Sequence, residues 1–304
     1  MPHTGVYFIP SSPNAPNILG PLTERLRSIY GDEVVPFGRW GLEHKLMKDT
    51  PSCLPASAHA PNPAPRPRYM HFLSTTNYPK VGFIYASSDT PRVGSEMVMS
   101  PVPITSSAEL FRHFVRACEP LWCHRHTVTV TGAIYDVGDF RVRLGEVRQT
   151  QPQARPRGTI MEVEWKGPSV IASAGALMAV EDGLADIEPS VDISYVPTEE
   201  EVNAEYADIA QLIREFWARL AIQDKTARES ILVPDLGKEV KERFNQRRQP
   251  GWYEREAQRR QKRLEALLLD RSWGGVSSLP EKEDDMDTGV DLARQYMELF
   301  RFNR

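Results

Sequence analysis

Cysteine is scarce in this sequence, and Cys53, Cys118 and Cys123 are its only three. A low, odd count does not make a disulfide framework, so we expect a reducing compartment, the cytosol or the nucleus. No apolar run approaches the roughly 20 residues that span a bilayer, and residues 1–10 show no basic cluster followed by an apolar stretch. We therefore expect neither a membrane span nor a signal peptide.

Positive charge is not in excess either. The chain has 37 Lys and Arg against 41 Asp and Glu, a formal net charge of −4. A slightly acidic balance gives no bulk attraction to nucleic acid or to an anionic membrane. We therefore expect no membrane association and no direct binding of nucleic acid by the chain as a whole.

The sequence also lacks the short motifs of many well-known enzymes. It has no glycine-rich phosphate loop, no G-x-S-x-G turn and no HExxH helix. Four soft metal ligands lie close together at Cys118, Cys123, His124 and His126. Zinc is usually held by two short-spaced pairs on separate arms, and no second pair follows. We therefore expect no metal site, no cofactor and no catalytic residue.

The chain does contain many short segments rich in β-branched and aromatic residues. Such segments, separated by turn residues, predict strands and hairpins. Consecutive short strands with short turns indicate an antiparallel sheet that is curled or closed. The predicted fold class is therefore α+β, an antiparallel, barrel-like β-sheet with flanking α-helices. The predicted strands lie at residues 5–9, 40–47, 69–74, 81–85, 93–100, 128–130, 140–144, 160–165 and 170–172.

Helices are predicted from apolar residues at helical spacing and from two capping boxes. Ser106 with Glu109 forms the first box, and Thr198 with Glu201 forms the second. The second box precedes a strongly apolar stripe, which predicts a helix that packs on protein. That stripe consists of Ile209, Leu212, Ile213, Phe216, Trp217 and Leu220. The predicted helices cover residues 22–30, 106–118, 175–184 and 209–220.

These elements predict a single barrel-like domain over residues 1–304 with two insertions. Six prolines in residues 51–67 indicate a flexible, proline-rich insertion. Residues at about 190–286 form a charged helical insertion. A last helix at 288–302 is too short to be stable alone in water, so we expect it to dock on the protein's own core.

One charged strand leaves an enzymatic alternative open. Glu162, Glu164 and Lys166 alternate along a predicted strand, so their side chains share one face. This E-x-E-x-K pattern resembles the metal-binding strand of tunnel-type triphosphatases, where carboxylates hold a divalent cation and the lysine meets phosphate. Arg141 and Arg143 on the preceding strand would also suit phosphates if they pointed inward.

A plainer interpretation of the same strand is an amphipathic one. Met161, Val163 and Trp165 would supply its buried face and the charged residues a face open to water. Such enzymes also need further charged strands that face the same tunnel, and the sequence does not identify them. We therefore keep the triphosphatase as an alternative only.

A second alternative is a nucleic-acid-binding module at residues 238–271. This stretch has 11 Lys and Arg and 6 Asp and Glu, a net of 11 − 6 = +5, and it contains aromatic residues that could stack on bases. The interspersed glutamates are also typical of a solvated, salt-bridged helix, which we favour.

Several collinear segments resemble Mediator complex subunit 20, in a form with insertions like the fungal ones. The resemblance covers residues 5–48, 68–185 and 288–302. It rests on the strand at Gly5-Val6, on Arg68–Leu73 with Asn77-Tyr78-Pro79, on Asp139–Gly145, on Arg157–Ser173, and most specifically on Gln295–Phe300.

This resemblance implies a nuclear, non-enzymatic subunit of the Mediator coactivator that acts as a protein-interaction scaffold for RNA polymerase II transcription. It implies a place in the head module, pairing with Mediator subunit 18, anchorage by a helix of subunit 8, contact with other head-module subunits, and indirect contact with the polymerase machinery. The residues that we expect to contribute to partner binding are Phe216, Trp217, Tyr296, Leu299 and Phe300.

Overall fold

The computed structural model describes residues 3–11, 17–54, 67–88, 99–118, 121–169, 198–222, 226–231 and 289–301, with isolated positions 249, 251 and 258. The chain divides into two compact units. The larger unit comprises Pro2–Gly167, Ile209–Leu232 and Gly289–Arg304, and the smaller comprises Met1, Pro168–Asp208 and Val233–Thr288. The single domain with insertions that the sequence suggests stays a prediction.

Several predicted segments lie outside the described residues. These are most of the strand at 93–100, the strand at 170–172, the helix at 175–184, nearly all of the basic stretch at 238–271, and most of the insertions at 51–67 and 190–286. Of the insertion at 51–67, the described beginning forms a short 3-10 helix, η2.

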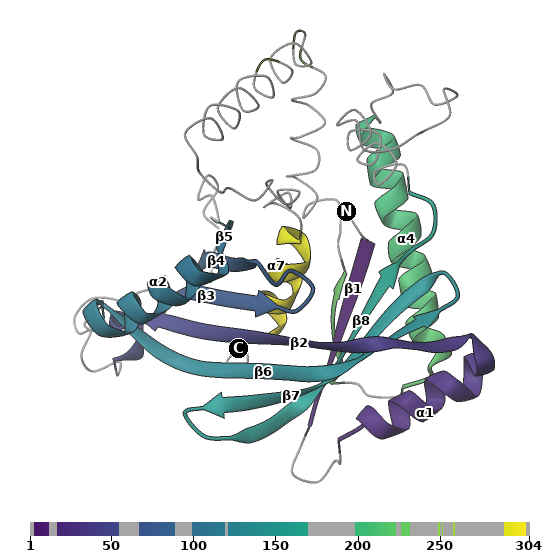
Figure 1. Ribbon diagram of the computed structural model, residues 1–304, viewed down its shortest axis with the longest axis horizontal. Coiled ribbons are helices and arrows are strands. Elements are labelled where there is room, and N and C mark those ends of the chain that lie inside the picture. The colour runs from purple at the N-terminus through teal and green to yellow at the C-terminus, as the bar shows by residue number, and fades with distance from the viewer. Residues whose placement is uncertain are drawn as a thin grey trace, which may run out of the picture. The chain divides into compact units, whose positions relative to one another are not determined.

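The larger unit is built on one nine-stranded sheet, in the order β5-β4-β3-β2-β6-β7-β8-β1-β9. Every neighbouring pair is antiparallel. The sheet is strongly curved but open, with β5 and β9 at its two edges (Figure 1). The α+β class with a curved antiparallel sheet is therefore confirmed. The strands are β1 (His3–Pro10), β2 (Val34–Asp49), β3 (Arg68–Thr75), β4 (Val81–Ser88), β5 (Met99–Pro103), β6 (Trp122–Val137), β7 (Phe140–Gln151), β8 (Arg155–Trp165) and β9 (Arg228–Ile231).

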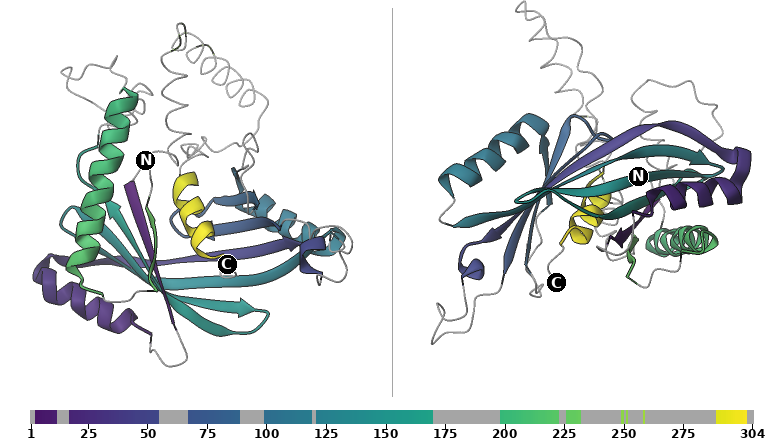
Figure 2. Two further views of the ribbon diagram at one scale, coloured as in Figure 1. Left: turned by 180° about the vertical axis from the view of Figure 1, so that it is seen from behind. Right: turned by 90° about the horizontal axis from the view of Figure 1, so that it is seen from below.

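Helices cover both faces of this sheet. Figure 1 shows α7 inside the curve, between β3 and β1, and α1 outside it, and the reverse view in Figure 2 agrees. The part of α4 that belongs to this unit, from Ile209 on, packs with α1 in one apolar cluster. The helices are α1 (Leu19–Tyr30), η1 (Gly31–Glu33), η2 (Pro51–Cys53), α2 (Ile104–Ala117), α4 (Glu199–Arg219) and α7 (Val290–Leu299).

The neighbouring strands β1 and β8, near one edge of the sheet, are buried on both faces. Along β1, Val6 and Phe8 belong to the cluster under α7, whereas Tyr7 belongs to the cluster under α1 and α4. On β8, Ile160 faces α7 and Met161 faces α1 and α4. Successive side chains of a strand point to opposite faces, so a strand that is covered on both sides reads as a nearly continuous apolar run.

Of the two predicted capping boxes, one is confirmed and one is wrong. At the start of α4, the Glu201 amide donates to Thr198 Oγ1 at 3.2 Å, and the Thr198 amide donates to Glu201 Oε2 at 2.7 Å. Helix α2 instead begins at Ile104, before Ser106, and no side chain caps it. The Ile104 amide donates to Lys80 O at 2.9 Å, so a backbone bond to a neighbouring turn sets the start of this helix.

The apolar face predicted for α2 is only partly covered. Phe111 and Phe114 pack edge-on against Phe72 of β3, with ring centroids 5.3 and 6.1 Å apart. Leu110 and Val115 remain exposed, at 40% and 37%. Cys118, the last residue of the helix predicted at 106–118, is a free thiol at the C-cap, since the helix ends at Ala117.

Candidate functional site

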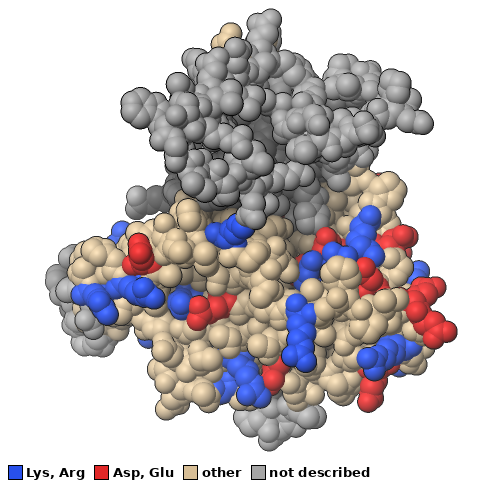
Figure 3. Space-filling view, in the orientation of Figure 1, with Lys and Arg blue, Asp and Glu red and all other residues tan. Residues whose placement is uncertain are grey.

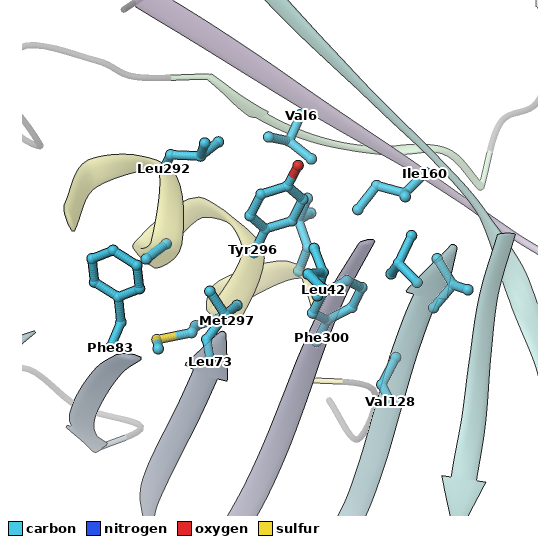
Figure 4. Close-up of a cluster of buried hydrophobic side chains, with 14 of the residues drawn as sticks. Val6, Leu42, Leu73, Phe83, Val128, Ile160, Leu292, Tyr296, Met297 and Phe300 are labelled. Carbon is cyan, nitrogen blue, oxygen red and sulfur yellow. The ribbon is translucent and has the colours of Figure 1, made fainter. Parts of the chain in front are cut away.

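The C-terminal helix α7 sits in an apolar hollow of the sheet, as its amphipathic pattern predicts. It begins after Gly289, whose φ of +90° suits glycine, and a Cβ there would lie 2.3 Å from the ring of Tyr78. The helix buries side chains against strands at both ends of the sheet (Figure 4). Those that it contributes to this cluster are Val290, Leu292, Ala293, Tyr296, Met297, Leu299 and Phe300.

A charged network lies beneath α7. Glu162 of β8 is fully buried, at 0% exposure, and its two carboxylate oxygens accept hydrogen bonds from Arg143 of β7 and from the hydroxyl of Tyr296. Arg143 also pairs with Glu164, at 2.7 Å between Nη2 and Oε2. The antiparallel register that places Arg143 opposite Glu162 creates this network, and Tyr296 ties the helix to it.

Burial and charge shift the pKa values of this network in a consistent way. Burial raises the pKa of Glu162, an effect that Arg143 opposes. Burial works against the charged form of Arg143, but Glu162 and Glu164 together raise the pKa of that guanidinium. Burial, and then Glu162, raise the pKa of Tyr296, so its hydroxyl stays protonated and can donate to the carboxylate.

The amphipathic interpretation of β8 expected the face with Glu162 to be open to water, but this face is covered. Met161 and Val163 are buried on one side, and α7 covers Glu162 on the other. That interpretation was wrong because a helix covers this face. The helix could not be inferred from the strand itself, since Tyr296 lies 134 positions after Glu162 in the sequence.

The residues of the triphosphatase alternative do not converge on an accessible site. Glu162 is sealed, and Glu164 is paired with Arg143. Lys166 Nζ lies 3.4 Å from Asp136 Oδ2, and Arg141 pairs with the same carboxylate at 2.8 Å. Both arginines considered for phosphate are already held by carboxylates, Arg143 by Glu162 and Glu164 and Arg141 by Asp136.

A second contact between α7 and β1 joins residues from the two ends of the described chain. The Thr4 hydroxyl donates to Gln295 Oε1 at 3.1 Å, and Gln295 Nε2 donates to the Thr4 carbonyl at 3.0 Å. Both residues are buried, at 1% exposure each. This pair of bonds fixes the position of the helix along β1 as well as its rotation.

A histidine cluster lies next to Phe300, and no sequence pattern indicates it. His44 Nε2 lies 3.1 Å from His71 Nδ1, and the rings of His44 and His126 are 6.0 Å apart. The ring of Phe300 covers His44 at 5.5 Å. Burial lowers the pKa of all three histidines, that of His126 to about 4, so the cluster is neutral at physiological pH. These residues sit on three neighbouring strands, and only the pairing of the strands unites them.

The five residues expected to bind a partner all contribute to the protein's own cores. Tyr296 and Phe300 have no exposed surface, and Phe216 and Leu299 are 3% and 5% exposed. Trp217 is half-buried and stacks on Tyr7 with ring centroids 4.1 Å apart. Self-packing of both helices is thus shown, and a role in partner binding stays a prediction.

Three of the four soft ligands considered for zinc take part in other side-chain contacts, and the ring of His126 belongs to the histidine cluster described above. Cys123 Sγ lies 3.4 Å from Thr50 Oγ1, and His124 Nε2 lies 3.0 Å from Thr127 Oγ1. Within the described ranges, no group of three or more His, Cys, Asp or Glu side chains is arranged to hold a metal ion. No helix among these residues is long and apolar enough to cross a membrane.

These features define an α+β protein with an open antiparallel sheet, in which a helix covers the buried charge of strand β8. The family model described as "TATA-binding related factor (TRF) of subunit 20 of Mediator complex" matches residues 1–301. The chain belongs to this family, which confirms the resemblance found in the sequence.

Two solved structures illustrate what the fold is similar to. A protein of Pyrococcus horikoshii OT3 is 15% identical, with 64% of this chain and 98% of that chain covered and a TM-score of 0.30. A chain of the Schizosaccharomyces pombe Mediator head module is 11% identical, with 71% of this chain and 95% of that chain covered and a TM-score of 0.29. No curated protein matches the sequence significantly.

Proposed function

We propose that this protein is a non-enzymatic subunit of the Mediator head module, which acts in the nucleus as a scaffold for RNA polymerase II transcription. The observation that carries the proposal is the family match over residues 1–301. The partners that we propose are Mediator subunit 18, a helix of subunit 8 and other head-module subunits, with indirect contact to the polymerase machinery.

The geometry of β8 supports a structural role for its charges. The carboxylate of Glu162 is fully buried and already bonded to Arg143 and Tyr296. A catalytic carboxylate must reach a metal ion or a substrate. In this arrangement Glu162 instead holds α7 in place, which stabilises the fold and needs no catalytic step.

A stretch of strand edge that no described strand pairs with supports a role in binding other proteins. β2 pairs with β6 from Val34 on, but it pairs with β3 only from Leu42 on. On the stretch before Leu42, Val35 and Phe37 are 55% and 60% exposed. Exposed backbone edges with apolar side chains are common sites of strand addition by a partner.

The charge distribution supports proteins as partners in preference to nucleic acid. Figure 3 shows Lys and Arg interspersed with Asp and Glu on the face that it draws, without an extended basic track. Nucleic-acid interfaces are much more positively charged than this.

Co-purification of the full-length chain with recombinant subunit 18 and the subunit 8 helix tests the proposal. The wild type should form a stable complex. Trp217→Ala removes the one half-exposed member of the predicted partner-binding set, and Phe37→Asp alters the free edge of β2 without touching a core. Loss of binding by a variant that keeps the wild-type circular dichroism spectrum would locate the interface. Failure of the wild type to bind either partner would refute the proposed assembly.

A phosphate-release assay tests the absence of catalysis. With manganese and a nucleoside triphosphate, we expect no release above background, because Glu164 is paired with Arg143 and Glu162 is sealed. Release by the wild type that disappears in Glu164→Ala would overturn the non-enzymatic assignment.

A further inference from the structure

A cleft of about 930 Å³ opens where β8 begins and where β1 and α7 end. The sheet register brings these parts together, since Pro10 pairs with Gly158 and Phe8 pairs with Arg228 of β9. The cleft lies at one end of three neighbouring strands. Of its lining residues, Phe8 and Leu299 belong to the apolar core under α7, and the polar ones lie outside both apolar cores. Its charged lining residues are Arg155, Arg157, Arg228, Arg301, Glu229 and Glu298.

The lining carries a positive excess, with four guanidinium groups against two carboxylates, a formal net of 4 − 2 = +2. Both carboxylates already have cationic neighbours. Glu229 pairs with Arg214 at 3.0 Å, and Glu298 lies 3.4 Å from Arg301 and accepts a bond from the Tyr85 hydroxyl at 3.2 Å. Glu229 is thus matched by Arg214, which lies outside the lining, whereas Glu298 offsets the cleft's own Arg301. The positive excess of the described lining therefore lies on Arg155, Arg157 and Arg228.

Two of the arginines crowd together on one neutral acceptor. Arg155 and Arg157 both donate to Gln149 Oε1, from Nε atoms at 3.4 and 2.8 Å. Burial, and then the charge of Arg155, lower the pKa of Arg157. Like charges held side by side are repulsive, and an anion placed between them would relieve that repulsion.

We propose that this cleft binds an acidic peptide segment of a partner protein, with carboxylate side chains on Arg155 and Arg157. The inference goes beyond the assignment to the head module and does not depend on it. A volume of about 930 Å³ is at the upper end of ordinary ligand pockets and far exceeds what one phosphate fills.

Other lining groups also suit a peptide. Pro10 and Leu299 add apolar surface, and Ser11, Thr226 and Ser230 add hydroxyl groups. Single-stranded nucleic acid fits less well, because its binding combines a basic groove with aromatic faces that stack on bases. The one aromatic residue of the described lining, Phe8, is 1% exposed, and Arg228 covers its ring at 4.9 Å.

Fluorescence anisotropy on the full-length protein tests this proposal. The probe is a labelled eight-residue peptide of alternating Asp and Glu, and the reference is the same peptide with Asn and Gln. We expect the acidic peptide to bind with an affinity that falls as salt rises, and the neutral peptide not to bind. R155Q/R157Q should weaken binding at least tenfold.

The matched control is R112Q/R148Q, which removes the same number of positive charges from exposed positions outside the cleft. This variant should bind as the wild type does. Equal binding by R155Q/R157Q and R112Q/R148Q would refute the proposal, because only net charge would matter. Equal binding of the neutral peptide would also refute it, and so would tighter binding of a 20-nucleotide single-stranded DNA in the cleft.

A second variant keeps the test decisive if R155Q/R157Q fails to fold. R155K/R157K retains both charges but lacks the two-pronged guanidinium geometry, so it should bind more weakly than the wild type. Titration of the wild type with the acidic peptide should also shift the amide NMR signals of Ser11 and Ser230. Unchanged signals at saturating peptide would place the binding elsewhere.

Discussion

The hydroxyl of Tyr296 should stabilise the protein more than any other tyrosine hydroxyl under α7. It donates to Glu162, a carboxylate with 0% exposure that water cannot reach in its place. Hydrogen bonds to charged groups contribute about 1.5–3 kcal/mol, and an unsatisfied buried group forfeits that amount. Tyr296→Phe keeps the ring and its packing, so we expect the free energy of unfolding to fall by about 1.5–3 kcal/mol.

Tyr7→Phe is the matched control for this experiment. Tyr7 is equally buried, at 1% exposure, but within the described part of the chain its hydroxyl has no hydrogen-bond partner. Removing that hydroxyl should leave stability unchanged or raise it slightly. Hydrogen exchange of the β8 amides reports on this unit directly. The anchoring role of the Glu162 network would be refuted if Tyr296→Phe lowered the free energy of unfolding by less than about 0.5 kcal/mol. It would also be refuted if both variants lowered it equally.

Three further predictions concern the cores and the pH dependence. Trp217→Ala should lower the free energy of unfolding by about 1.5–3 kcal/mol, because the stack on Tyr7 is lost, and an unchanged urea midpoint would contradict this. A chain that ends at Asp287 lacks α7, so it should lose its near-ultraviolet circular dichroism and bind ANS, whereas a native spectrum would show that the sheet is stable alone. His126 has its folded pKa lowered to about 4, so it stabilises the fold above pH 6.5 and this stability is lost as the pH falls toward 4. At 1.36 kcal/mol per pH unit, the loss is about 3 kcal/mol, and His126→Asn should show less acid sensitivity in urea titrations.

Local patterns were sufficient to predict most strands of the sheet. Apolar and charged residues alternate around Phe140–Leu144 because of the pleat of a strand, and Asn77–Lys80 has the residue types of a turn. Both features depend only on neighbours in the sequence. The same holds for the confirmed capping box at Thr198 and for the docking face of α7. The start of α2 was missed because it depends on Lys80, a residue of another turn.

The candidate site was harder to predict because its parts come from distant segments. The E-x-E-x-K pattern indicates which side chains share a face, but not what covers that face. Whether Glu162 meets water, a metal ion or Tyr296 depends on a helix 134 positions away. Likewise, His44, His71 and His126 lie on separate strands and have no recognisable spacing, so only the strand pairing reveals the cluster.

The bond between Thr4 and Gln295 spans 291 positions in the sequence. Nearly the whole described chain must therefore be synthesised before the contact between β1 and α7 can form. Until then the apolar hollow of the sheet is open, and contacts of such long range slow folding and prolong exposure to aggregation. A nascent chain of this protein should thus depend on chaperones until α7 emerges, and premature termination just before the helix should yield a product that quality control degrades.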